Sequence, residues 1–170
     1  VSKVSVESDT MTIRQLNSYK HTFREVTFDD SNALSGAVKK LRMTKDDEEI
    51  SYIRKAQEIA ETAFEELLPF IRAGVTEREI ALELNRLMFF YGAEDLSFET
   101  IALAGANTSM PHGVPSDKKV GEGEFVLLDF GAVWNGYHSD MTRTVCVGKP
   151  SEEMEKVYNV VLEAQLAALE

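Results

Sequence analysis

Two aspartates, Asp129 and Asp140, lie on the two arms of a predicted β-hairpin and are the strongest candidates for chemistry in the chain. The Asn-Gly pair at 135–136 lies between two apolar runs, and both of its residues tolerate the positive φ angles of a two-residue turn. Such a turn makes Gly131 face Asp140 and Asp129 face Thr142. Because side chains alternate along a strand, both aspartates point to one face, with Cβ atoms about 5–8 Å apart. Gly131 is expected to leave open space beside them.

Two carboxylates on one face repel each other, so either one of them is protonated or a cation lies between them. Carboxylate oxygens suit hard divalent ions such as Mn²⁺, Mg²⁺, Zn²⁺ or Co²⁺. Two metals bridged by a carboxylate would hold and activate a water molecule. The alternative is a solvated sheet face on which the aspartates bond to hydroxyls such as those of Thr142 and Thr144. The residues alone leave both interpretations open.

Three further side chains are candidates for chemistry. His112 lies in a loop between Pro111 and Gly113, where it could bond to a substrate or transfer a proton, or be an ordinary loop histidine. The hairpin register places His138 on the aspartate face, where it could bind metal, although a single histidine is more often packed or solvated. Cys146 is interpreted as a small buried hydrophobic residue, because nothing near it in the sequence marks a nucleophile.

Two amphipathic helices come before the hairpin, since apolar residues recur with the 3.6-residue period. A capping box is predicted at the start of each, Thr44 with Asp47 and Thr76 with Glu79. The expected elements are, in order, helices over 44–71 and 76–91, a strand at 100–104, a loop at 105–117, strands at 124–134 and 137–147, and a helix opening at Pro150-Ser151.

The first 43 residues differ from the rest in composition. Residues 1–43 hold seven basic and five acidic side chains, whereas residues 44–170 hold eleven basic and twenty-four acidic ones. A domain boundary is therefore predicted near Met43. The first segment is expected to run strand, helix, strand, helix, and it is too short for a core of its own. Its expected elements are a strand at 4–7, a helix at 10–20, a strand at 24–28 and a short helix capped by Ser31.

Composition excludes several classes of protein. The formal net charge of −11 argues against a nucleic-acid binder, and the 44% of hydrophobic residues excludes a wholly disordered chain. Apolar runs are too short for a transmembrane helix, and no secretory leader is visible. The single cysteine excludes an internal disulfide framework. The chain opens at Val1 without methionine and closes at Glu170 inside a helical pattern, so a piece of a longer protein is expected.

Several motifs in order resemble the pita-bread metallopeptidases, which include Xaa-Pro aminopeptidase, Xaa-Pro dipeptidase and methionine aminopeptidase. The motifs are LLDFGA at 127–132, GYHSDMTRT at 136–144, PHG at 111–113, and LRMTK at 41–45 continuing into EEISYIRKA at 48–56. The resemblance implies an α/β (α+β) fold, the first half of a pita-bread fold. Residues 1–43 would be the C-terminal remnant of a creatinase-type N-terminal domain, and residues 44–170 the N-terminal half of the catalytic domain.

By this resemblance, Asp129 would chelate one metal ion and Asp140 would bridge two. His112 would be the catalytic residue that contacts the scissile amide or stabilises the tetrahedral intermediate, and it would bind substrate together with Phe98. Thr142 would contact the carboxylates and orient them without binding metal itself. The implied reaction is hydrolysis of the peptide bond before proline, in a peptide with proline at its second position. The implied cofactors are two divalent metal ions, Mn²⁺ in first place, with Co²⁺ or Zn²⁺ as alternatives.

The family completes its metal site with one histidine and two glutamates from the second half of the fold, beyond Glu170. Glu152, Glu153 and Glu155 are too near the hairpin to replace them and fit the acidic first turn of a helix. The chain alone is therefore expected to be inactive. Two alternatives stay open: a non-catalytic pita-bread binding module, and a creatinase-like hydrolase of a non-peptide C–N bond. A homodimer in the cytoplasm is expected, with no nucleic-acid or membrane partner.

Overall fold

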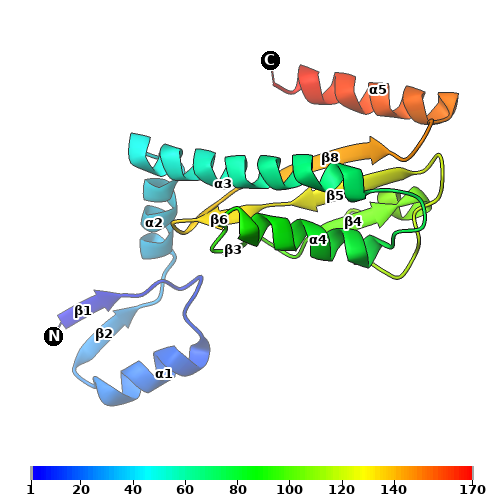
Figure 1. Ribbon diagram of the computed structural model, residues 1–170. Coiled ribbons are helices and arrows are strands. Elements are labelled where there is room, and N and C mark those ends of the chain that lie inside the picture. Colours follow the sequence, from blue (N-terminus) through cyan, green and yellow to red (C-terminus); the bar gives the residue numbers. More distant parts are fainter. Residues whose placement is uncertain (1, 170) are drawn as a thin grey trace. The chain divides into compact units, whose positions relative to one another are not determined.

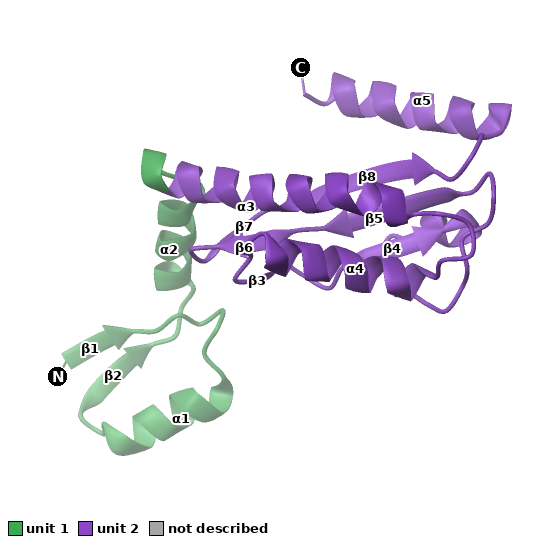
Figure 2. Ribbon diagram, in the orientation of Figure 1, with its two compact units in different colours: residues 1–48 green, residues 49–170 purple. Residues whose placement is uncertain are grey.

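The computed structural model describes residues 2–169, and the chain divides into two compact units (Figure 2). The first unit is Val1–Glu48 and the second is Glu49–Glu170, and each is described by itself. The terminal residues Val1 and Glu170, the second of which lies in the predicted helical pattern at the end of the chain, are outside the described residues. The assignment of residues 1–43 to a creatinase-type domain stays a prediction.

The described part of the first unit is a βαβ arrangement followed by a helix (Figure 1). Its elements are β1 (Ser2–Ser5), α1 (Ile13–Thr22), β2 (Val26–Asp29) and α2 (Ala33–Met43). β1 and β2 pair in parallel, from Ser2 opposite Val26 to Ser5 opposite Asp29. A parallel pair needs a crossover connection, and α1 lies in it. Lys3 Nζ lies 2.9 Å from a carboxylate oxygen of Asp29, and this hydrogen bond is the main reason that the pKa of Asp29 falls to about 2.

Helix starts in the first unit differ slightly from the predicted ones. Helix α1 begins directly after Thr12, whose side chain and that of Gln15 form a complete capping box. The predicted cap of the next helix, Ser31, is wrong, because Asn32 occupies the N-cap position of α2. The backbone N–H of Ser31 donates instead to Asp29 Oδ1 at 3.1 Å. That bond holds Ser31 in the turn before the helix.

The remaining helices are α3 (Asp47–Leu67), a 3-10 turn (Leu68–Phe70), α4 (Glu77–Phe90), a 3-10 turn (Gly105–Ser109) and α5 (Glu152–Ala167). The capping box of Thr76 and Glu79 is confirmed, since Glu79 Oε2 accepts from Thr76 N at 2.8 Å. The one predicted at Thr44 is wrong: α3 begins only at Asp47, and Thr44 is the extended C-cap residue of α2. Among residues 2–169, no helix has the length and apolar character needed to cross a membrane.

The strands of the second unit are β3 (Asp95–Leu96), β4 (Ile101–Ala104), β5 (Phe125–Phe130), β6 (Ala132–Trp134), β7 (Tyr137–His138) and β8 (Met141–Cys146). Within the described residues they form two three-stranded antiparallel sheets, ordered β4-β5-β8 and β3-β6-β7. The predicted hairpin turn is confirmed, with φ angles of 48° at Asn135 and 73° at Gly136. Each predicted arm is divided in two, at Gly131 and at 139–140, where the chain passes from one sheet to the other.

The core of the second unit lies between α3, α4 and one face of the sheets (Figure 1). Alternate residues of β5, namely Val126, Leu128 and Phe130, are fully buried in it. The Phe130 ring stacks on Phe64 of α3, with ring centroids 6.1 Å apart. The other residues of β5, including Asp129, therefore point to the opposite face of the sheet.

Helix α5 begins where predicted, since Ser151 Oγ accepts from Met154 N at 3.2 Å. The Tyr158 ring lies against Phe125 of β5, with centroids 6.3 Å apart. Most apolar side chains of this helix are nevertheless exposed. They are Val157, Tyr158, Val160, Val161, Leu162 and Leu166.

Candidate metal and substrate site

A cavity of about 420 Å³ in the second unit brings together four of the five predicted site residues. These four are Phe98, His112, Asp129 and Asp140. The rest of the lining consists of Glu99, Thr100, Ile101, Gly113, Val114 and Pro115. Strand β4 with its preceding residues, the loop after it and both arms of the hairpin therefore converge on one space.

Asp129 lies on the central strand of its sheet and is half-buried. It pairs with Ile101 of β4 on one side and with Thr142 of β8 on the other, so the predicted register is confirmed. Thr142 Oγ1 donates to Asp129 Oδ1 at 3.1 Å, which orients the carboxylate. Asp140 is exposed and lies in the interruption between β7 and β8.

The expectation of open space at Gly131 is wrong. A Cβ atom at this position would overlap the backbone carbonyl of Ser139. The 3% exposed Ser139 is held there by its N–H, which donates to Ala132 O at 2.9 Å, and by its hydroxyl, which donates to Ala56 O of α3 at 3.2 Å. Gly131 therefore permits a close backbone crossing, and this crossing places Asp140 at the cavity.

His112 lies on an exposed stretch of the loop between β4 and β5. The loop passes close over β4, because a Cβ atom on Gly113 would lie 2.6 Å from Leu103 Cδ1. Gly113 N also donates to Met110 O at 3.2 Å, which closes a turn around the histidine. His112 thus lines the cavity from a loop, and the contacts that hold this loop determine where the histidine lies.

Glu77, which no sequence motif singled out, holds that loop. Glu77 is fully buried at the first turn of α4 and accepts hydrogen bonds from Ala104, Asn107 and Ser116. Burial raises the pKa of the Glu77 carboxyl, but the hydrogen bonds outweigh it and hold the pKa below its ordinary value. A signal was present, because Glu77 is three residues before Ile80 and lies on the apolar stripe of the helix.

Acid is expected to destabilise the second unit through Glu77. A carboxyl whose pKa is lowered by folding stabilises the fold above its unfolded pKa, ordinarily 4.5, and this contribution is lost as pH falls through the folded pKa. Glu124, whose pKa is lowered chiefly by a hydrogen bond from Lys118, acts in the same direction. Urea unfolding followed by Trp134 fluorescence should give a free energy of unfolding that falls below about pH 4.5. A free energy that stays level or rises down to about pH 3 would contradict this.

The donors of the cavity suit a hard divalent cation in part. Asp129 and Asp140 supply carboxylate oxygens, the ligands that such ions prefer. Within residues 2–169, no group of three or more His, Cys, Asp or Glu side chains could hold a metal ion. A cation held only by these two carboxylates would be weakly bound, so the pair would need further donors to form a metal site.

Two other candidates lie outside this cavity lining. His138 pairs with Val133 in the β6–β7 ladder, as the register predicted, but it is exposed and does not line the cavity. Burial raises the pKa of the half-buried Cys146 thiol, and Glu122 adds to the effect. A raised thiol pKa disfavours the nucleophilic thiolate.

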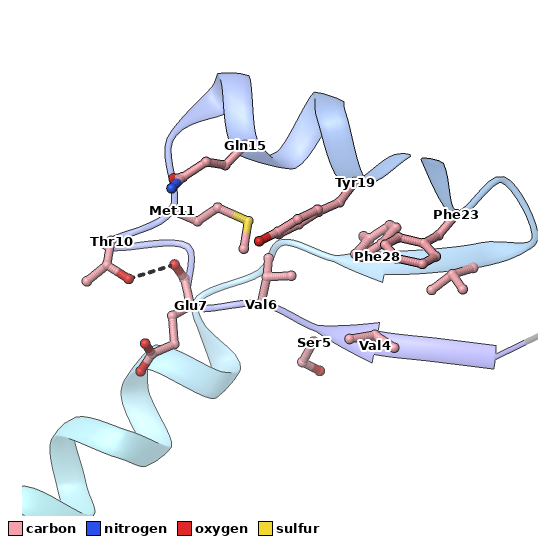
Figure 3. Close-up of a pocket in the computed structure, with 11 residues that line it drawn as sticks. Val4, Ser5, Val6, Glu7, Thr10, Met11, Gln15, Tyr19, Phe23 and Phe28 are labelled. Atoms are coloured by element: carbon pink, nitrogen blue, oxygen red, sulfur yellow. Dashed lines mark hydrogen bonds between the residues drawn. The ribbon is translucent and has the colours of Figure 1, made fainter. Parts of the chain in front are cut away.

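The first unit contains a cavity of about 660 Å³ that is larger than the candidate site (Figure 3). It lies between helix α1 and the β1–β2 pair, where Tyr19 stacks on Phe28 with ring centroids 6.4 Å apart. Most of its lining is apolar: Val4, Val6, Met11, Tyr19, Phe23, Val26 and Phe28. Its described lining contains no histidine and a single carboxylate, that of Glu7, so it does not offer the pair of carboxylates found at the candidate site.

The chain belongs to metallopeptidase family M24, and the sequence model of this family matches residues 51–170. An uncharacterized peptidase of Staphylococcus aureus (strain MSSA476) is 36% identical over 170 residues, which are 100% of this chain and 48% of that protein. The chain thus spans about half the length of the curated relatives it matches.

Solved structures agree with this assignment. The Xaa-Pro dipeptidase from Bacillus anthracis matches with a TM-score of 0.91 and 44% identity, over 97% of this chain and 45% of that one. The X-Pro aminopeptidase from Thermotoga maritima MSB8 matches with a TM-score of 0.92 and 39% identity, over 100% and 47%. Prolidase from Pyrococcus furiosus gives 0.89 and 38%, over 100% and 49%. The predicted fold class, the first half of a pita-bread fold, is confirmed.

Proposed function

We propose that this chain is part of a metal-dependent exopeptidase that hydrolyses Xaa-Pro peptide bonds, of the aminopeptidase P or prolidase type. One observation carries the proposal: Phe98, His112, Asp129 and Asp140 line a single cavity. The similarity to an Xaa-Pro dipeptidase and an X-Pro aminopeptidase supports the substrate class. Because the chain spans about half the length of its relatives, the activity is proposed for the longer natural protein that contains these residues, called the longer protein below.

In this proposal Asp129 and Asp140 hold divalent metal, Mn²⁺ in first place, together with ligands from elsewhere in the longer protein. When bound, such ions lower the pKa of water and polarise a carbonyl oxygen. Thr142 fixes the orientation of Asp129 through its hydroxyl. Both aspartates line the cavity, so their carboxylate oxygens are available to a cation bound there.

The substrate is bound by the other two lining residues. His112 lies on the exposed loop, where its imidazole donates a hydrogen bond to the scissile amide or to the charge that develops on it. Phe98 provides an apolar surface for the proline ring. The hydrolysis adds one water across the C–N bond and releases the N-terminal residue and the proline-led product.

The test compares hydrolysis of Ala-Pro and Ala-Ala dipeptides by the longer protein and by residues 1–170 alone. The longer protein should cleave Ala-Pro after Mn²⁺ is added, lose this activity with a chelator and leave Ala-Ala nearly untouched. Residues 1–170 alone should show no turnover, since two carboxylates are only part of the ligand set.

Other outcomes separate the alternatives. Cleavage of a non-peptide C–N substrate in place of Ala-Pro would favour a creatinase-like hydrolase. Inactivity of the metal-loaded longer protein on every substrate would favour a binding module. Substantial turnover by residues 1–170 alone would refute the expectation that this chain is inactive by itself.

A further inference from the structure

The Glu77 carboxylate is bonded to both ends of the loop that carries His112. Its Oε1 accepts from Ala104 N at 2.8 Å and from Asn107 Nδ2 at 2.9 Å, both at the start of the loop. Its Oε2 accepts from Ser116 N at 3.0 Å and from Ser116 Oγ at 2.6 Å, at the end of the loop. One side chain on α4 thus brings together two chain segments on either side of the histidine.

The backbone at the start of α4 binds the same end of the loop. Glu77 N donates to Lys118 O at 3.0 Å, and the N–H of the next residue donates to Ser116 O at 3.0 Å. The described backbone bonds between residues 107 and 113 are turns within the loop itself. The described hydrogen bonds that join the loop of His112 to α4 therefore lie at the two ends of the loop.

Burial makes these bonds strong and their loss costly. Glu77 has 0% exposure, and a carboxylate in such a place is unfavourable unless donors satisfy it. Hydrogen bonds to an ionised acceptor are roughly twice as strong as neutral ones. The carboxylate and the loop therefore depend on each other: without the loop Glu77 is unsatisfied, and without Glu77 the loop ends lose their common acceptor.

We propose that Glu77 is a positioning residue, which fixes His112 at the cavity that Asp129 and Asp140 also line, without touching substrate itself. The inference rests on the proposed function, because positioning matters to a reaction only if His112 takes part in it. Geometry of this kind is demanding, since a displacement of about 1 Å in a reacting group costs about 100-fold in rate.

The first test is Glu77→Gln, which keeps the shape of the side chain but replaces one acceptor oxygen with an NH₂ donor. One end of the loop then faces a donor in place of an acceptor. Hydrogen exchange at the Ala104 or Ser116 amide of residues 1–170 should become about tenfold faster or more. In the longer protein kcat should fall about 100-fold. Mn²⁺ affinity should change little, because the aspartates lie on the hairpin.

Glu79→Gln is the matched control. Glu79 lies in the same helical turn and caps α4 through Thr76, but it is exposed and bonds to nothing in the loop. Both variants should lower the melting temperature. Only Glu77→Gln should change the exchange of the loop amides, kcat and the imidazole NMR signals of His112.

Ser116→Ala is a second variant for the case in which Glu77→Gln does not fold. It removes the hydroxyl that donates to Glu77 Oε2 and keeps the buried carboxylate. It should lower kcat about tenfold and shift the His112 signals in the same direction. If the longer protein proves to have no peptidase activity, the proposed function fails, and the His112 signals still decide the positioning role. Unchanged His112 signals in both variants, or equal effects of Glu77→Gln and Glu79→Gln, would overturn the inference.

Discussion

Gly131→Ala is expected to destabilise the second unit by about 3 kcal/mol or more. The new Cβ atom would overlap the carbonyl oxygen of Ser139. That backbone cannot move away freely, because Ser139 N donates to Ala132 O and Ala132 N donates to Ser139 Oγ, both at 2.9 Å. Chemical denaturation followed by the fluorescence of Trp134, the single tryptophan, measures the loss.

Gly136→Ala is the control within the same hairpin. Gly136 has a φ angle of 73°, and nothing lies within 4 Å of a Cβ atom built there. An alanine therefore meets conformational strain without overlap and should cost about 1 kcal/mol. Gly131 has no left-handed φ, so its loss would come from the contact alone. A loss at Gly131 no larger than that at Gly136 would show that the backbone crossing is loose.

Asp129→Asn and Asp140→Asn are each expected to abolish metal-dependent turnover in the longer protein, with kcat/KM falling about 10³-fold or more. Asparagine keeps the size of the side chain but removes the charge that a hard cation needs. Initial rates on Ala-Pro across a range of Mn²⁺ concentrations measure the effect. Melting temperatures should hardly change, because in the first variant the Thr142 hydroxyl can still donate to the amide oxygen that replaces the carboxylate oxygen.

Thr142→Val provides a graded comparison for the aspartate variants. It removes the hydroxyl that donates to Asp129 Oδ1 and leaves both carboxylates in place. Loss of such a supporting partner typically lowers metal affinity or activity about 10–100-fold. If the aspartates belong only to a solvated sheet face, all three variants should keep full activity, and this result would remove them from the proposed site.

The hairpin was the most predictable part of the fold, because local chemistry determines it. An Asn-Gly pair between apolar strands allows one type of tight turn, and the turn fixes the register of Asp129 against Thr142. The capping box at Thr76 is local in the same way. Three of the four cavity residues, His112, Asp129 and Asp140, come from three separate motifs that the family resemblance brought together and that periodicity could not. The resemblance also supplied Phe98, which lies before these motifs.

What the sequence did not reveal depends on contacts between distant segments. The backbone crossing at Gly131 involves Ser139 and a carbonyl of α3, and no pattern within the hairpin encodes it. Glu77 satisfies its charge with donors up to 39 residues away. At the helix starts, adjacent residues with similar capping ability compete. Ser31 and Asn32 are such a pair: the N–H of Ser31 donates to Asp29 in the preceding turn, and Asn32 occupies the N-cap position.

The short connection between Asp129 and Asp140 also affects the order in which the site forms. A hairpin closed by two residues can begin to form in about 1–10 μs from contacts that are close in sequence, whereas the crossing at Gly131 also needs the bond from Ser139 to Ala56 O of α3. The loop of His112, by contrast, is fixed only when residues 39 positions apart, Glu77 and Ser116, have met. Because contacts distant in sequence form more slowly, we expect the turn of the hairpin to form before the loop of His112 is fixed. The register of Asp129 against Thr142 is thus a local product of the chain, whereas the placement of Asp140 and His112 at the cavity is a product of the completed fold.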